Sequence, residues 1–147
     1  MYSQRVKTIM DEQNLLLVTP ETTVREAAAM MAGSNVGAVL VINNRQHKQL
    51  VGIFTERDVV FRIVGPGLDP ASATVGEFMT AAPQSISPDE TYGYALLLMH
   101  EHHFRHMPVL ADGVPVGIVS SRNALDPDME EFVSERQRRI NIRPLTA

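Results

Sequence analysis

The chain has 147 residues, a net charge of −4 and no cysteine. The acidic balance argues against a nucleic-acid partner, and the lack of cysteine excludes disulfides, cysteine zinc ligands and cysteine nucleophiles. Hydrophobic residues make up 44% of the chain, which is enough for a buried core. No apolar run approaches the roughly 20 residues of a membrane span, and the first residues lack the apolar core of a signal peptide. We expect a folded cytoplasmic protein without a membrane partner.

The first predicted elements are a lead-in segment, VKTIM at 6–10, and a helix that starts after Thr23. Thr23 is a typical N-cap residue, and Glu26 stands where it can complete a capping box. One face of this helix carries the apolar residues Val24, Ala27, Ala28 and Met31. GAVLVI at 37–42 and LVGIFT at 50–55 have the composition of strands, and a second helix is expected after them.

The same order of patterns recurs in the second half of the chain. TPETTVREAAAMM at 19–31 aligns with SPDETYGYALLLM at 87–99, and GAVLVI aligns with RHMPVL at 105–110. LVGIFTERDVV at 50–60 aligns with PVGIVSSRNAL at 115–125, and the lead-in aligns with VGEFM at 75–79. Thr91 takes the place of the N-cap, although Tyr94 cannot complete a capping box. A unit of this size is marginally stable alone, so we expect the two copies to share one core.

The duplication defines the expected organisation of the chain. We assign residues 4–64 to the first repeat, 65–74 to a connector and 75–126 to the second repeat. Residues 127–147 form a C-terminal helix and tail. That helix would be capped by Asp126 or Asp128, with a narrow apolar stripe of Met129, Phe132 and Val133.

This ordered set of motifs, present twice, resembles the cystathionine-β-synthase (CBS) domain as a tandem pair (Bateman module) of the stand-alone bacterial type. The resemblance implies an α/β (α+β) fold with two β-α-β-β-α repeats packed sheet to sheet in pseudo-twofold symmetry. It also implies adenosine-type ligands (AMP, ADP, ATP, NAD or S-adenosylmethionine) in clefts between the repeats, a homodimer of modules and an unknown effector protein. We therefore expect a regulatory module that senses energy or redox state.

Thr55 and Asp58 are the binding candidates of the first repeat. A carboxylate can accept hydrogen bonds from both ribose hydroxyls, and a helix start favours anions. The same spacing is also that of an ordinary capping box, and one pair can serve both roles.

Ser120 and Asn123 hold the matching places in the second repeat, where the family pattern prefers aspartate over asparagine. An amide can still bind ribose, but without the strength of a charged acceptor. In the family, basic residues at the positions of Arg105 and His106 face the ligand's phosphates. The first repeat has Gly37 at the aligned place, so we expect two unequal clefts.

The resemblance carries further candidates into the nucleotide site, mainly as backbone or apolar contacts. A phosphate in the first cleft would need a cation such as Arg57 or Arg62, and Arg122 is the basic residue of the second motif. The remaining candidates are Lys7, Thr8, Ile9, Val36, Ile53 and Ile118.

Two other functions are compatible with the sequence. HEHHFRH at 100–106 suggests a metal-dependent hydrolase, but Phe104 stands where HExxH needs its second histidine. The repeat alignment also ends the helix near His103 and places His106 on a strand, so we expect neither a metal nor catalysis. The alternative to a nucleotide sensor is a structural dimerisation module with degenerate clefts.

Overall fold

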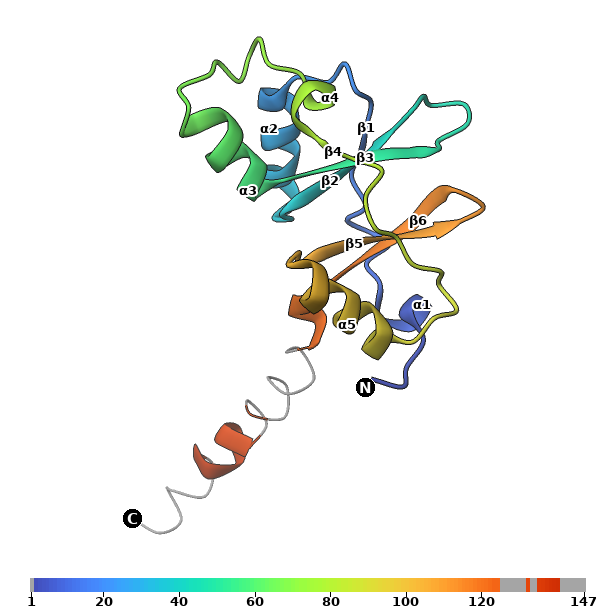
Figure 1. The fold of residues 1–147 in the computed structure, drawn as a ribbon. Coiled ribbons are helices and arrows are strands. Elements are labelled where there is room, and N and C mark those ends of the chain that lie inside the picture. The colour runs from blue at the N-terminus through green and yellow to red at the C-terminus, as the bar shows by residue number, and fades with distance from the viewer. Residues whose placement is uncertain (1, 125–131, 133–134, 141–147) are drawn as a thin grey trace.

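The computed structural model describes residues 2–124, 132 and 135–140. The first repeat contains β1 (Leu17–Val18), α2 (Val24–Ser34), β2 (Ala38–Ile42), β3 (Leu50–Thr55) and α3 (Glu56–Asp58), which continues as the π-helix η1 (Val59–Val64). The second contains α5 (Tyr92–His102), β5 (His106–Ala111), β6 (Val114–Ser120) and the 3-10 helix η2 (Ser121–Ala124). Two short lead-in helices, α1 (Val6–Ile9) and α4 (Val75–Phe78), precede the repeats, and β4 (Thr80–Ala81) follows α4. Figure 1 shows two halves, each with helices beside a small sheet, which confirms the expected mixed α+β fold.

The long helix of each repeat starts and ends in the same way. The Thr23 side chain accepts a hydrogen bond from the Glu26 N–H, and Thr91 accepts one from the Tyr94 N–H. Both predicted N-caps are therefore confirmed. At the other end, Asn35 terminates α2 and His103 terminates α5 in the left-handed conformation. The helix thus ends where the repeat alignment placed it, and His106 lies on β5 as expected.

The two sheets follow one plan. In the first, the strand order is β1-β2-β3-β4, with β1 parallel to β2 and the other neighbours antiparallel. In the second, antiparallel β5 and β6 are flanked by two single bridges, Ile86 beside Val109 and Asp11 beside Ile118. These bridges occupy the places that β1 and β4 hold in the first sheet.

The lead-in segments are exchanged between the repeats. Helix α1 packs against α5 and β6, so Val6 is fully buried in the core of the second repeat. Helix α4 contacts β3, and Val75 is fully buried in the core of the first repeat. Backbone bonds fix both segments: the Val6 N–H donates to the Glu90 carbonyl at 2.8 Å, and the Val75 N–H donates to the Thr22 carbonyl at 2.8 Å. Each repeat is completed by the segment that precedes the other repeat in the chain.

The core has three parts where we expected one. Each repeat buries its own cluster between helices and sheet, around Phe54 in the first and around Tyr92 in the second. A smaller third cluster joins the two sheets, and it contains Ala38, Leu40 and Ile53 packed against Leu15, Leu17, Leu50 and Ile118. The exchanged lead-ins explain why each repeat has a core of its own. They add buried apolar side chains to each repeat, which would otherwise have to bury the same surface against the other repeat.

Little of the predicted C-terminal helix falls within the described residues. Asp126, Asp128, Met129 and Val133 lie outside them, and Phe132 is exposed. Among the helices that are described, none has the length and apolar character needed to cross a membrane.

Candidate functional site

A cavity of about 1130 Å³ opens between the two repeats. The first repeat supplies the inner face of α2, the turn after it, the start of β2 and the helix that follows β3. The second supplies the start of β5, the end of β6 and η2, while the segment after α1 closes one side. A space of this size is large enough for a nucleotide.

The cavity brings together eight of the predicted site residues. Both repeats contribute, and the second contributes the larger share: Val36, Gly37, Arg105, His106, Ile118, Ser120, Arg122 and Asn123. Seven predicted residues are not among its lining: Lys7, Thr8, Ile9, Ile53, Thr55, Arg57 and Asp58.

Ser120 and Asn123 form a closed turn at the end of β6. The Asn123 Oδ1 accepts a hydrogen bond from the Ser120 N–H at 2.8 Å and another from the Ser120 hydroxyl at 3.3 Å. This arrangement ends the strand and starts η2, because it satisfies an N–H that the helix leaves without a partner. The Asn123 amide nitrogen makes no hydrogen bond to another described residue, so it can donate to a ligand.

Thr55 and Asp58 form the same turn in the first repeat. The Asp58 Oδ2 accepts from the Thr55 N–H at 2.9 Å and from its hydroxyl at 3.2 Å, and the Asp58 N–H donates back at 3.4 Å. The other carboxylate oxygen forms an ion pair with Arg62 at 3.5 Å. This pair is therefore a complete capping box, and its carboxylate is already occupied.

One backbone hydrogen bond ties each of these turns to the strand beside it. The Glu56 N–H donates to the Gly37 carbonyl at 2.9 Å, and the Ser121 N–H donates to the Arg105 carbonyl at 3.1 Å. These two bonds are equivalent in the repeat. They place residues 37 and 105 at the same point of the two turns, where the first repeat has a glycine without a side chain and the second has an arginine.

Gly37 lies where side chains of the two repeats come together at the cavity. A Cβ at this position would lie 2.9 Å from the Glu56 Oε1 and 3.4 Å from the His106 Nε2. Glycine leaves this space free, which allows a carboxylate of the first repeat and an imidazole of the second to converge on one spot.

The charged groups of the cavity are unevenly distributed. Arg105, His106 and Arg122 come from the second repeat, and Glu56 comes from the first. Burial lowers the pKa of His106 below its usual value; the Glu56 carboxylate opposes this shift and the Arg105 guanidinium adds to it. The carboxylate of Asp11, the fifth charged group, accepts hydrogen bonds from the Gln13 and Asn14 N–H groups and the Asn14 amide.

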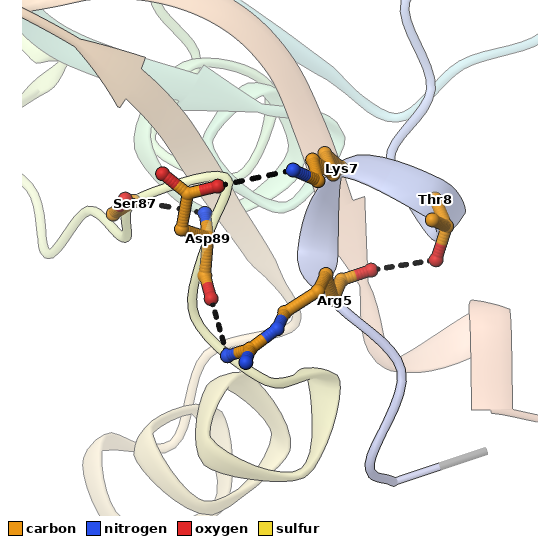
Figure 2. Close-up of polar contacts among 5 residues, drawn as sticks. All are labelled: Arg5, Lys7, Thr8, Ser87 and Asp89. Atoms are coloured by element: carbon orange, nitrogen blue, oxygen red, sulfur yellow. Dashed lines mark hydrogen bonds and ion pairs between the residues drawn. The ribbon is translucent and has the colours of Figure 1, made fainter.

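The predicted residues of α1 have other contacts, which Figure 2 shows. The Lys7 Nζ forms an ion pair with the Asp89 carboxylate at 3.2 Å, and the Arg5 guanidinium donates to the Asp89 carbonyl at 2.8 Å. The Thr8 hydroxyl donates to the Arg5 carbonyl at 2.7 Å. Because the lead-in is exchanged, Arg5 and Lys7 fasten α1 to the loop before α5, and none of these three residues lines the cavity.

The three remaining predicted residues also have structural contacts. Ile9 packs on the core of the second repeat, and Ile53 belongs to the cluster between the sheets. The Arg57 guanidinium lies 4.7 Å from the centre of the Phe61 ring, a cation–π contact.

Sequence reasoning did not single out Glu56, Asp11, Asn14 or Leu15, which all line the cavity. Glu56 aligns with a serine in the second repeat, so the comparison of repeats gave no reason to select it. Asp11, Asn14 and Leu15 follow the lead-in, and their position depends on the exchange. A carboxylate directly after Thr55, in a motif selected for binding, was the available signal for Glu56.

The histidines at 100–106 do not form a metal centre among the described residues. No group of three histidine, aspartate or glutamate side chains within that part of the chain could hold a metal ion. His102 instead stacks on Phe104, with ring centres 6.2 Å apart.

Comparison with known proteins defines the class of this fold. The family model of the CBS domain matches residues 6–65 and 75–128. The chain therefore belongs to the CBS domain family and carries the domain as a tandem pair.

Relatives from several kingdoms share this pair. The CBS domain-containing protein YhcV of Bacillus subtilis is 34% identical over 115 residues, which are 78% of this chain and 79% of that protein. The meiotically up-regulated gene 70 protein of Schizosaccharomyces pombe is 33% identical, and the match spans 83% of this chain but only 18% of that protein. The mitochondrial CBSX3 protein of Arabidopsis thaliana is 33% identical, and the chain spans 61% of its length.

Solved structures share the fold. A conserved protein from Pyrococcus horikoshii matches with a TM-score of 0.78 and 30% identity, covering 87% of this chain and 94% of that one. The CBS domain protein PAE2072 of Pyrobaculum aerophilum, solved in complex with AMP, matches with a TM-score of 0.75 and 24% identity, covering 82% and 89% of the two chains.

Proposed function

We propose that this protein is a regulatory module that binds an adenosine-type nucleotide in the cavity between its repeats and acts as a cytoplasmic sensor of energy or redox state. The candidate ligands are AMP, ADP, ATP, NAD and S-adenosylmethionine. One observation carries the proposal: the cavity places Arg105 and His106 beside the Ser120–Asn123 turn and opposite Gly37.

The lining suits the three parts of a nucleotide. Leu15, Val36 and Ile118 offer an apolar wall for an adenine ring. The free amide nitrogen of Asn123 can donate to a ribose hydroxyl. The guanidinium groups of Arg105 and Arg122 make no hydrogen bond or ion pair with other described residues, so both are available to a phosphate.

Binding at this place can regulate a partner because the lining comes from both repeats. A ligand that contacts both sides stabilises the arrangement in which it fits, and it shifts the protein toward that arrangement by its difference in affinity. The AMP complex of the Pyrobaculum protein supports the capacity of this fold to hold such a ligand. We propose binding rather than catalysis, since the Ser120 hydroxyl and Asn123 are used in a helix cap.

We also propose that the modules form a homodimer that presents the signal to an effector protein. Large apolar side chains are exposed along the helix after β3 and the turn behind it, namely Val60, Phe61, Val64 and Leu68. Phe61 is 65% exposed and Val64 is 64% exposed, which is costly in water unless another surface covers them.

Calorimetry with AMP, ATP, NAD and S-adenosylmethionine tests the binding, together with mass spectrometry of small molecules released from the purified protein. We expect micromolar to millimolar affinity for at least one of these compounds. If no adenosine compound binds and none is released, the proposal is wrong.

A second function is favoured by the two closed turns. Asp58 and Asn123 each satisfy a local helix start, so both can be explained as structural residues without a ligand. A structural module would form an unliganded dimer, and the loss of either side chain would change stability alone. Sedimentation measurements with and without AMP distinguish a ligand-sensitive dimer from a constant one.

A further inference from the structure

Glu56 stands apart from the other charged residues of the cavity. It is the first residue of α3, and its N–H is fixed to the Gly37 carbonyl at 2.9 Å. Its carboxylate lies against Gly37 at the spot that the His106 Nε2 approaches from the other repeat. The Glu56 Oε1 and the His106 Nε2 can be no farther apart than the sum of their distances to that spot, so the carboxylate lies close to the imidazole of the second repeat.

The charges of the cavity nearly cancel. Two arginines, Arg105 and Arg122, face two carboxylates, Asp11 and Glu56, and burial favours the neutral form of His106. Asp11 is held by three local hydrogen bonds. Glu56 makes no hydrogen bond or ion pair from its side chain to any described residue, so no cation of the protein neutralises its charge before a ligand enters.

A phosphate that reaches Arg105 and His106 must therefore approach Glu56. Each further negative charge on a ligand gains attraction from the arginines but meets repulsion from this carboxylate. A ligand with one phosphate can turn its charge toward Arg105, whereas a triphosphate must spread its charge over a larger part of the cavity.

We propose that Glu56 determines which adenosine ligands the cavity accepts, by disfavouring polyphosphates relative to a monophosphate or an uncharged adenosine compound. The inference rests on the proposed function, because it assigns a specificity-determining residue to the same cavity. The proposal explains why a carboxylate stands in a cavity whose unpaired guanidinium groups, those of Arg105 and Arg122, suit a phosphate.

The test measures the affinities of adenosine, AMP and ATP for the wild-type protein and for Glu56→Gln. The variant keeps the backbone hydrogen bond and the size of the side chain. We expect affinity for adenosine to change less than about twofold, affinity for AMP to rise about threefold and affinity for ATP to rise about tenfold. The gain should shrink as salt is raised, since exposed charges are screened.

Glu21→Gln is the matched control. Glu21 is exposed at the turn before α2 and does not line the cavity, so it carries the same change in net charge elsewhere. We expect its affinities for all three compounds to equal those of the wild type. An equal gain in Glu21→Gln, or an equal change for all three compounds in Glu56→Gln, would overturn the role of Glu56. Wild-type protein that binds none of the three, and neither NAD nor S-adenosylmethionine, overturns the proposed function as well.

Discussion

Where the last strand of each repeat meets the following helix, the first repeat has Thr55 and Asp58 and the second has Ser120 and Asn123. The hydrogen bonds of the two turns are nearly the same, and so is the backbone bond that joins each turn to the neighbouring strand. The shared hydrogen bonds explain why the two turns have the same local fold although one has an aspartate and the other an asparagine. They also show that the same turn geometry accepts either a charged carboxylate or a neutral amide.

The side chains around these turns have opposite charge. The first repeat places Glu56 beside Gly37, whereas the second places Ser121 beside Arg105. The arginines that line the cavity, Arg105 and Arg122, both come from the second repeat. If a nucleotide binds here, we expect its phosphate to point toward the second repeat, and three experiments test this asymmetry.

The largest expected effect is that of Arg105→Ala on nucleotide affinity. Loss of a charge-assisted hydrogen bond to phosphate costs about 2 kcal/mol, or roughly thirtyfold in the Kd of AMP. Calorimetry with AMP and adenosine measures it, and adenosine should be almost unaffected because it has no phosphate. Arg25→Ala, an exposed change on α2 outside the cavity, serves as the control. An equal loss for adenosine would show that Arg105 supports the fold rather than the phosphate.

The next comparison sets Asp58→Ala against Asn123→Ala. Each substitution removes the side chain that closes a turn, so we expect each to lower the free energy of unfolding by about 1 kcal/mol. Only Asn123 lines the cavity, so Asn123→Ala alone should weaken AMP binding, by about fivefold for one neutral hydrogen bond. Urea denaturation and calorimetry on both variants measure the two effects. A greater loss of affinity in Asp58→Ala would place the ligand at the first repeat instead.

The smallest effect concerns pH. Because burial lowers the pKa of His106 in the folded protein, the unfolded chain takes up this proton more readily. The effect is absent above the usual histidine pKa, the free energy of unfolding falls as the pH drops from that value to the lowered one, and it stays constant below the lowered value. Urea denaturation at pH 7.5 and 5.5 should show a smaller fall in His106→Gln than in the wild type. His47→Gln, in an exposed turn, should behave as the wild type does.

Much of the fold could be predicted from the repeat alone. Thr23 and Thr91 identified the helix starts, and the aligned strands located the end of α5 at His103. These features depend on local sequence patterns, and each pattern is seen twice because the two repeats align. The exchange of lead-ins could not be predicted, because an alignment relates equivalent segments without showing on which copy they pack.

In the candidate site too, local motifs could be predicted from the sequence, whereas contacts that depend on the packing of the repeats could not. Arg105, His106, Ser120 and Asn123 were recognised from their motifs, and all of them line one cavity. Lys7 and Thr8 were expected in a nucleotide site, but neither lines this cavity: Lys7 pairs with Asp89, and the Thr8 hydroxyl donates to the Arg5 carbonyl. Glu56 could not be selected from the sequence, because its place in the cavity depends on how the two repeats pack. Only the structure brings its carboxylate to Gly37 and near His106.

The exchanged lead-ins also have a consequence for how such a chain is held together. Each repeat binds the lead-in helix, or arm, that precedes the other repeat in the chain. The arrangement is like that of a dimer whose subunits swap their N-terminal arms. Cutting the chain within residues 65–74 would leave two fragments, each carrying the arm that its counterpart needs. The fragments would refold as a complementing pair, and neither would complete its core alone. The covalent connection supplies the high effective concentration that keeps the two partners together.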